Sequence, residues 1–277
     1  MITVVIPNYN GRLLLEKFLP SVFSSLAYAK ADFEFIVVDD CSTDTSIPFL
    51  RAEYPQIKIL KNNSNIGFAR TCNRGIMAAK GEHLLLLNTD IELTPSYIKK
   101  CLDGFVNNNT FAVMGLAMDD SPNPQTTGIF FKQKTFSIKK YPNHSSNETH
   151  FISGANTLFD TKKIQEIGGF NPIFSPYYFE DDDLSFRAML KGWKSYFLKD
   201  ALCYHLGSST IKSSARKRKI KRVYFRNKII FNRLHSKSSI ETFNLKNLVI
   251  NVLPKYCIGK FWIWNSYNDY LALTQEN

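Results

Sequence analysis

The stretch HLLLLNTD, residues 83–90, decides the fold of this chain. Four consecutive leucines between polar residues are typical of a strand buried on both faces, as in the centre of a parallel sheet. The strand runs into Asn88, Thr89 and Asp90. Ligands of open α/β sheets bind beyond the carboxyl ends of the strands, so Asp90 is placed to hold a hard cation. The alternative is that Asp90 caps a following helix with Pro95 in its first turn.

Strands and helices alternate on both sides of this stretch. ITVVI (2–6) is apolar and β-branched, and FEFIVVDD (33–40) again runs into acids. The predicted strands are residues 2–6, 33–40, 57–60, 83–90 and 111–118, and the predicted helices are residues 14–26, 47–52, 69–79 and 95–106. This alternation predicts an α/β fold with a mostly parallel central sheet and right-handed crossovers.

The pattern changes after residue 118. Residues 119–150 are rich in Pro, Asn, Ser, Thr and Lys, which predicts an irregular hairpin or a flexible lid. Regular structure is expected again at residues 150–160. The acid cluster 180–183 then precedes a short helix that ends at Gly192.

The positive charge is concentrated at the C-terminal end. The chain of 277 residues has a formal net charge of +11. Residues 206–277 contain 14 Lys and Arg but only three acids, while residues 1–205 are balanced. This asymmetry predicts an anionic partner, which by charge alone is either nucleic acid or anionic lipid.

The cysteines and the apolar runs indicate the compartment. Five widely spaced cysteines without a C-x-x-C pair predict neither a disulfide framework nor a zinc site. The opening MITVVIPNYN lacks the features of a signal peptide, and no run reaches the roughly 20 apolar residues of a membrane span. Polar residues interrupt the longest candidate, 245–264, which is suited to lie on a membrane. We therefore expect a cytoplasmic protein, peripheral on the inner face of the cell membrane.

Acids follow several of the predicted elements. Asp39, Asp40, Asp90 and the cluster 180–183 would meet at one edge of a parallel sheet. Oxygen ligands suit Mg²⁺ or Mn²⁺, which also bind substrate phosphates. The alternative is that the acids only stabilise turns and helix N-termini. Neither G-x-G-x-x-G nor G-x-x-x-x-G-K-[ST] occurs, and no Ser-His-Asp arrangement is evident.

Together these segments resemble family 2 glycosyltransferases of the GT-A fold, and the resemblance covers about residues 2–210. The matching segments, in family order, are VVIPNYNG (4–11), VVDDCSTD (37–44), NIGFARTCNRGI (65–76), LLLNTDIEL (85–93), SGANTLFD (153–160), GGF (168–170), EDDDLSFRAMLKGW (180–193) and His205 with Gly207 and Ser209. The resemblance implies a bacterial-type sugar transferase of cell-surface glycan assembly. Its donor would be a UDP- or dTDP-sugar, and its acceptor a hydroxyl of a glycan or lipid-linked glycan.

The resemblance also implies roles for single residues. Asp181 aligns with the general base of an inverting transfer, with helix capping as the alternative role. Asp183 and Arg187 are expected to form a structural pair. The residues implied at the donor nucleotide are Pro7, Tyr9, Asp39, Asp40, Gly67, Arg70, Asn88 and Thr89. Asp40 would read the pyrimidine, and Asn73 is expected to be structural.

The implied metal ligands are Asp90 and His205. The family motif usually begins with Asp, whereas this chain has the neutral Asn88 there. We therefore expect dependence on Mg²⁺ or Mn²⁺ at a weak site completed by the diphosphate of the donor.

The tail is expected to be a separate unit. Residues 1–210 would form the catalytic domain, with a nucleotide-binding half (1–118) and an acceptor half (119–210), and residues 211–277 a basic helical extension. Apolar residues of 215–237 recur at spacings of three and four, which predicts a basic amphipathic helix. Its function is predicted to be a peripheral anchor on an anionic membrane. The alternative is a helix packed on the catalytic body.

Two other classes of function remain. One is a non-catalytic relative that binds nucleotide sugars, to which Asn88 lends some support. The other is a nucleic-acid-binding protein that uses the basic tail, but stacking and groove-reading motifs are absent, so no nucleic-acid partner is expected.

Overall fold

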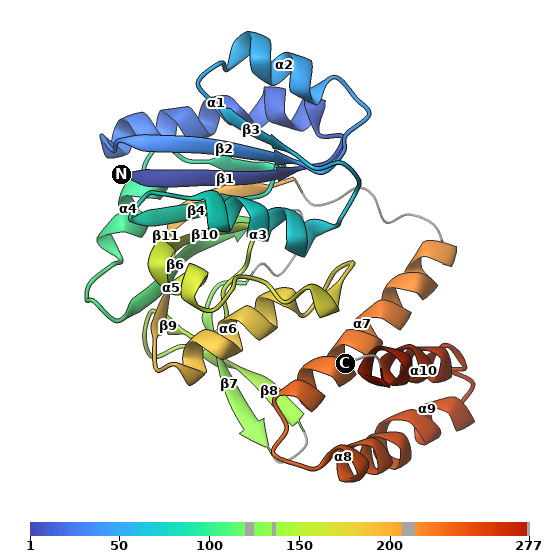
Figure 1. Ribbon diagram of the computed structural model, residues 1–277. Coiled ribbons are helices and arrows are strands. Elements are labelled where there is room, and N and C mark those ends of the chain that lie inside the picture. Colours follow the sequence, from blue (N-terminus) through green and yellow to red (C-terminus); the bar gives the residue numbers. More distant parts are fainter. Residues whose placement is uncertain (120–124, 135–136, 207–213, 276–277) are drawn as a thin grey trace.

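A mixed sheet of nine strands forms the centre of the molecule (Figure 1). The computed structural model describes residues 1–119, 125–134, 137–206 and 214–275. The order of the strands is β3-β2-β1-β4-β10-β6-β11-β5, and β9 pairs with β11. The strands are β1 (Ile2–Asn8), β2 (Phe33–Asp39), β3 (Lys58–Lys61), β4 (His83–Leu87), β5 (Ile91–Leu93), β6 (Thr110–Met118), β9 (Glu148–Thr149), β10 (Asn156–Asp160) and β11 (Lys194–His205).

Strand β4 lies in the interior of the sheet, as its four leucines predict. It pairs in parallel with β1 and antiparallel with β10, and Leu84 to Leu87 are completely buried. The three pairs among β3, β2, β1 and β4 are parallel, and so is the pair of β6 with β11. The antiparallel strands β5, β9 and β10 are the departure from an all-parallel sheet.

Two layers of helices cover the sheet. On one face lie α1 (Arg12–Ala29), α2 (Ser46–Glu53) and α4 (Tyr97–Asp103), which share one apolar core with the sheet. On the other lie α3 (Phe68–Ala78), α5 (Thr161–Glu166) and α6 (Glu180–Leu190), which share a second core. Alternate residues of each strand face opposite sides of the sheet, so Leu85 and Leu87 join the first core and Leu84 and Leu86 the second.

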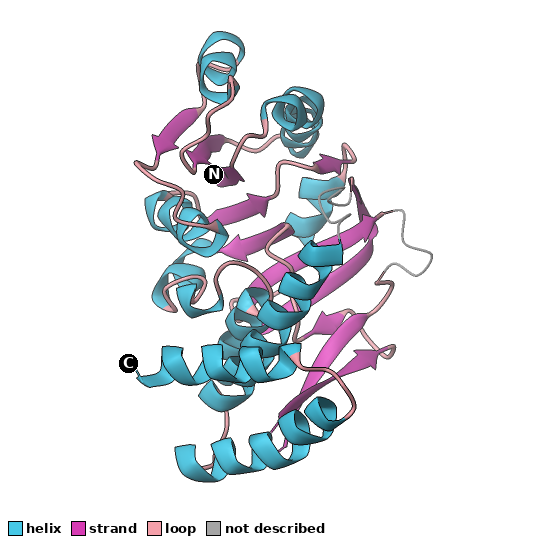
Figure 2. Ribbon diagram, turned by 90° about the vertical axis from the view of Figure 1, so that its right-hand side faces the viewer, coloured by secondary structure: helices cyan, strands magenta, loops and turns pink. Residues whose placement is uncertain are grey.

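The C-terminal helices stand apart from the sheet, at the end of the molecule opposite α2 (Figures 1 and 2). They are α7 (Ser214–Leu234), α8 (Ile240–Asn247), the π-helix η2 (Leu248–Val252), α9 (Leu253–Cys257) and α10 (Trp262–Gln275). A third core joins them to the hairpin β7 (Gly128–Lys134) and β8 (Ser137–Asn143), to the 3₁₀-helix η1 (Pro172–Phe174) and to α6. The hairpin predicted within 119–150 is therefore present in the described part of that region.

Several predicted boundaries shift, and one shift matters for the site. Strand β4 ends at Leu87, and β5 begins directly after Asp90. Pro95 precedes α4 instead of lying in its first turn. Asp90 therefore lies between two strands and does not cap a helix, which removes the alternative role considered for it.

The amphipathic face of α7 is another correction. Val223, Ile230 and Phe231 are buried in the third core, while Tyr224 and Leu234 remain about half exposed. The apolar face of α7 is thus packed on the body of the protein and is not available as a membrane anchor.

Candidate active site

Asp40 lies just beyond β2 and holds the loop before α3. Its Oδ1 accepts hydrogen bonds from Asn62 Nδ2 (2.8 Å) and the Ile66 backbone N–H (2.9 Å), and its Oδ2 accepts one from the Gly67 N–H (3.0 Å). Gly67 has φ +85°, a conformation that favours glycine. A carboxylate has about four acceptor positions, so Asp40 retains one for a ligand. Its reading of a pyrimidine stays a prediction.

The neighbouring Asp39 fixes the turn after β1. Its carboxylate accepts hydrogen bonds from Asn8 Nδ2 (2.9 Å) and the Ser42 N–H (3.0 Å). Pro7 in β1 is partly exposed and Tyr9 is 55% exposed, so the tyrosine ring is accessible beside this turn. Arg70, on the first turn of α3, is also exposed, as a diphosphate contact requires.

The two predicted metal ligands lie together. Strand β5 pairs with the end of β11, and this pairing places His205 Nε2 3.2 Å from Asp90 Oδ2. The hydrogen bond that His205 donates to Asp90 raises the pKa of His205. Asn88 and Thr89 lie on the turn before Asp90 and are partly buried.

These residues fit a divalent cation that the donor helps to hold. The buried Oδ1 of Asn88 has no hydrogen-bond partner among the described residues, so an oxygen ligand is available there. No group of three His, Cys, Asp or Glu side chains with metal-site geometry occurs in the part of the chain that the structure describes. Asp90 and His205 would thus hold Mg²⁺ or Mn²⁺ with Asn88 beside them, and donor oxygens would fill the remaining positions.

Asp181 lies in the first turn of α6, and a backbone group orients it. The N–H of Gly154 donates to Asp181 Oδ1 over 2.9 Å. Burial, and next the charge of Glu180, raise the pKa of Asp181 well above its usual value. Burial also raises the pKa of Glu180 to about 7, and Glu180 Oε2 has no partner among the described residues. A carboxylate with raised proton affinity is suited to act as a general base near neutral pH.

The segment 153–155 connects this base to the end of β4. The Asn88 N–H donates to the Ala155 carbonyl (2.9 Å), one residue beyond the Gly154 contact with Asp181. A cavity of about 210 Å³ is lined on one side by Ser153 and Ala155 and on another by His205. The segment that orients Asp181 and the predicted metal ligand His205 therefore border the same space.

The thiol of Cys72 on α3 shows that the donor side is close as well. Burial, and then the charges of Asp181, Glu180 and Asp40, raise the pKa of this thiol. The acid at the end of β2 and the acid in α6 thus act on one buried atom. Both acids therefore lie within electrostatic range of Cys72.

The acids of α6 predict a pH dependence. A general base acts in its deprotonated form, so kcat/KM should rise about tenfold per pH unit below the shared apparent pKa of Asp181 and Glu180. Lys140, which pairs with Asp182, opposes this shift. In Glu180→Gln the acidic limb of the pH–rate profile should move to lower pH, because Asp181 loses a neighbouring negative charge. An unchanged pH–rate profile in this variant would contradict the coupling.

The same shift has an effect on stability. The pKa of Glu180 is raised on folding, so the folded state favours its protonated form. Its contribution is complete below the unfolded-state pKa and is lost as the pH rises toward 7. The free energy of unfolding should therefore fall over this interval in the wild type and fall less in Glu180→Gln, as measured by urea denaturation at a series of pH values.

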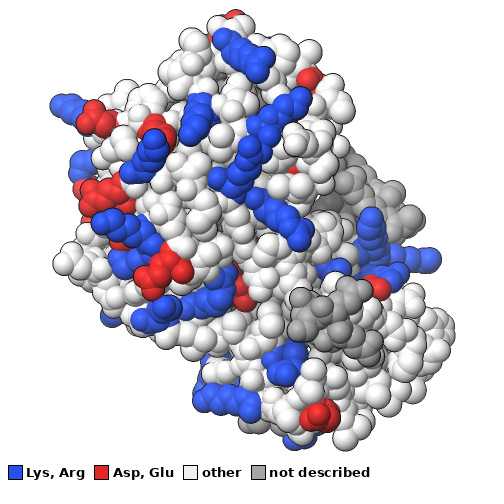
Figure 3. All heavy atoms as spheres, viewed as in Figure 1, with Lys and Arg blue, Asp and Glu red and all other residues white. Residues whose placement is uncertain are grey.

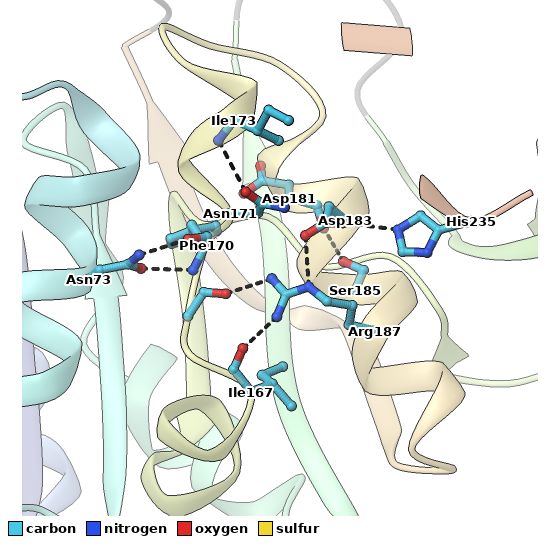
Figure 4. A network of polar contacts seen from close by, with 11 residues as sticks. Asn73, Ile167, Phe170, Asn171, Ile173, Asp181, Asp183, Ser185, Arg187 and His235 are labelled. Atoms are coloured by element: carbon cyan, nitrogen blue, oxygen red, sulfur yellow. Dashed lines mark hydrogen bonds and ion pairs between the residues drawn. The ribbon is translucent and has the colours of Figure 1, made fainter. Parts of the chain in front are cut away.

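A polar network behind the acids ties α6 to three other segments (Figure 4). Asp183 accepts from Arg187 Nε (2.7 Å), the predicted pair, and contacts His235 Nε2 at the end of α7 (2.9 Å). Arg187 also donates to the carbonyls of Ile167 and Gly169. Asn73 of α3 holds the backbone of Phe170 at both ends, which confirms its structural role.

Asn227 of α7 holds the loop that leads into α6. It is fully buried, and its Nδ2 lies 2.6 to 2.9 Å from the carbonyls of Phe174, Tyr177 and Tyr178. Tyr178 and Phe179 both have φ +73°, a conformation that costs a non-glycine residue about 1–3 kcal/mol. Asn227 thus holds a strained segment directly before Glu180.

Replacing Asn227 by alanine should affect stability and catalysis together. Buried carbonyls lose their donor, so the free energy of unfolding should fall by about 2–3 kcal/mol. Relaxation of the loop should also lower kcat more than it weakens nucleotide binding. The control is Asn232→Ala on the same helix, since Asn232 accepts from Ile138 N–H in the hairpin instead (2.7 Å). Equal losses of kcat in both variants would contradict a role of Asn227 in placing the loop.

Several of these supporting residues have no recognisable signal in the sequence. Asn8, Asn62 and Gly154 lie inside or near matched segments, and their proximity to acids became visible only once the strands were aligned. Asn227 and His235 lie in the tail that was interpreted as a separate extension. Gly207 and Ser209 of the closing motif lie outside the described residues.

Comparisons with known proteins agree with this geometry. The family described as Glycosyl transferase family 2 matches residues 3–168, more than half of the chain. Glycosyltransferase GlyG of Streptococcus pneumoniae serotype 4 is 28% identical over 213 residues, which are 73% of this chain and 69% of GlyG. Over three further curated relatives, the chain spans only 33%, 32% and 44% of their lengths.

Solved structures show the same fold. The structure of S. aureus TarS 1–349 in complex with UDP-GlcNAc has a TM-score of 0.62 at 16% identity and covers 98% of this chain and 81% of its own. The mannosyltransferase PcManGT from Pyrobaculum calidifontis, in complex with GDP-Man and Mn²⁺, has a TM-score of 0.62 at 14% identity, over 99% of this chain and 75% of its own. The predicted GT-A fold is confirmed. With the match over residues 3–168, the chain belongs to glycosyl transferase family 2.

Proposed function

We propose that this chain is an inverting glycosyltransferase that moves a sugar from a UDP- or dTDP-sugar to a hydroxyl of a glycan or lipid-linked glycan. The observation that carries the proposal is the bridge 153–155. It connects the oriented, partly buried carboxylate of Asp181 to the strand end that bears Asp90. A nonspecific surface acid would have no backbone donor fixing its carboxylate.

In this proposal the residues divide into three tasks. Asp40, Pro7, Tyr9 and Arg70 bind the nucleotide, and Asp39 with Gly67 shapes the turns around it. Asp181 takes the proton of the acceptor hydroxyl as the oxygen attacks the anomeric carbon from the face opposite the leaving diphosphate. Asn88, Thr89, Asp90 and His205 hold the diphosphate end.

The proposed cofactor is Mg²⁺ or Mn²⁺. When bound, the cation supplies neutralisation of the negative charge that the leaving diphosphate develops. Mn²⁺ is present with a nucleotide sugar in the complex of PcManGT, which supports this assignment. Asp90 supplies the one formal negative charge of its motif, since Asn88 is neutral, so binding of metal and donor should depend on each other.

The test is a panel of nucleotide sugars with the purified full chain and Mn²⁺. Release of nucleoside diphosphate is measured without an acceptor and with candidate glycans. We expect turnover with at least one UDP- or dTDP-sugar, and an inverted anomeric configuration of the product by NMR. Binding of the nucleotide sugars without turnover under any condition, together with an unchanged result for Asp181→Asn, would support a non-catalytic relative instead.

The proposed place of action is the cytoplasmic face of an anionic membrane. The charge of the C-terminal segment supports an anionic partner, and the absence of a nucleic-acid recognition motif in the sequence favours lipid. Among the described residues, no helix has the length and apolar character needed to cross a bilayer.

A further inference from the structure

The helices α8, η2 and α9 carry an apolar ridge that nothing in the described chain covers. Leu245, Val249, Leu253 and Tyr256 are spaced by three or four residues, so they share one side of this continuous helical segment. All four are exposed, and Leu245 is 65% exposed. The solvent-exposed face of a helix is normally polar.

An aromatic cluster extends the ridge onto α10. The ring of Tyr256 lies 5.2 Å from that of Phe261 and 5.8 Å from that of Trp264, measured between centroids. Phe261 is 62% exposed, and Ile258 beside it is 69% exposed. Tyrosine and tryptophan on an apolar ridge are typical of side chains that lie at the level of lipid headgroups.

A basic pocket opens beside the ridge, between β8, α7 and the same helical segment. Its volume is about 450 Å³, and its wall contains Lys139, Lys228, Lys246 and Lys255 but no acidic residue. Phe225, Ile229 and Phe243 contribute apolar side chains to it. Among the described residues, no carboxylate forms an ion pair with Lys139, Lys228 or Lys255.

Lys255 is held among apolar and basic side chains in this pocket. Burial, and then the positive charges of Lys228 and Lys260, lower the pKa of Lys255, whose Nζ lies 4.7 Å from the ring centre of Phe225. Of the two acids within residues 214–275, Asp269 pairs with Arg222, and Glu241 is exposed on α8 outside the pocket. Basic side chains also gather at the exposed N-terminal end of α7 (Figure 3), among them Lys217, Arg218 and Lys219.

We propose that the end of the molecule formed by α8, η2, α9 and the start of α10 docks on an anionic phospholipid surface, with the ridge in the headgroup region and a headgroup phosphate in the pocket of Lys139 and Lys228. An apolar ridge alone would fit any apolar partner. The adjacent basic pocket selects a partner that is both apolar and phosphate-bearing, which is the chemistry of an anionic lipid. The inference deepens the proposed place of action and assigns it to a surface other than the buried face of α7.

The experiment is flotation of the full chain with vesicles of phosphatidylglycerol and phosphatidylcholine, compared with phosphatidylcholine alone. We expect binding to the anionic vesicles only. In Lys139→Glu/Lys228→Glu the partition coefficient should fall at least about tenfold, because each basic residue near an anionic surface contributes about 1 kcal/mol to binding. The matched control, Lys58→Glu/Lys80→Glu, makes the same change of net charge on exposed lysines of the nucleotide half. An equal loss of vesicle binding in the control would contradict the role of the pocket in lipid binding.

The ridge is tested in parallel. Val249→Ser/Phe261→Ser should lose vesicle binding, and Leu13→Ser/Met77→Ser, which removes exposed apolar side chains elsewhere, should keep it. Circular dichroism and nucleotide-sugar turnover in solution establish that each variant is folded. Binding of inorganic phosphate by the full chain, without flotation on the anionic vesicles, would show a site for free phosphate and overturn lipid docking. Vesicle binding needs no donor, so its failure would leave the proposed transferase activity untouched, and the reverse also holds.

Discussion

Asp181→Asn is expected to lower sugar transfer by about 10²–10⁴-fold, the usual contribution of a positioned general base. Asparagine keeps the shape of the side chain and can still accept the hydrogen bond from Gly154 N–H, but it cannot take a proton. Nucleotide binding should change little because Asp40 and its neighbours lie at another strand end. The measurement is the initial rate of transfer, with calorimetry of UDP binding in Mn²⁺ beside it.

The matched control for this variant is Asp103→Asn, an exposed acid on α4 whose one ion pair among the described residues is with Lys99 on the same helix. Its rate should equal that of the wild type. If Asp181→Asn retained most of its activity while its fold and nucleotide affinity were intact, Asp181 would have the capping role that was weighed as its alternative, and another group would remove the proton.

The second large effect is expected at Asp90. Asp90→Ala removes the formal negative charge of this motif and breaks the contact with His205. If the diphosphate end depends on a cation here, transfer should fall by about 10²-fold, and the rate should no longer respond to Mn²⁺. EDTA should reduce the wild type to a similar level.

A nearby substitution separates this effect from a general change of charge. Glu92→Gln alters an exposed acid on β5, two residues from Asp90, and should leave both the rate and its dependence on Mn²⁺ unchanged. Full activity of the wild type in excess EDTA would remove the metal role of Asp90 and His205, even if Asp181 behaved as expected.

The central strands were predictable because short segments of the sequence specify them. Leucines 84–87 and the alternating segments before them specify buried strands and crossing helices without reference to distant residues. The direction of strand β10 was harder to predict. Its residues, NTLFD, do not distinguish a parallel from an antiparallel strand, and its direction is set by its partners β4 and β6. The boundary at Asp90 depended likewise on β11, which is more than 100 residues away.

The tail shows the limit of this reasoning most clearly. The amphipathic pattern of α7 correctly predicts a helix with one apolar face, but it contains no information on what that face packs against. Phe131 of the hairpin and Phe186 of α6 supply the contact with Phe231. Asn227 and His235 became important only because this packing brings α7 against the loop and acids that precede and begin α6.

For the site, the ordered motifs identified the acids, and the structure adds how they are held. Asp90 and His205, 115 positions apart in the chain, lie within 3.2 Å of each other. The backbone donors to Asp40 and Asp181 come from loops whose course no local pattern specifies. The donor, metal and base roles of these residues remain predictions for the variants described above.

The central claim is that one sheet edge binds a nucleotide diphosphate and a divalent cation together. Calorimetric titration of the full chain with UDP and with dTDP, in Mn²⁺ and in EDTA, tests it most directly. The account predicts binding of at least one of the two in Mn²⁺, at least about tenfold weaker binding in EDTA, and the same weakening for Asp90→Ala in Mn²⁺. Absence of binding by either nucleotide, or equal affinity in Mn²⁺ and EDTA, would contradict it.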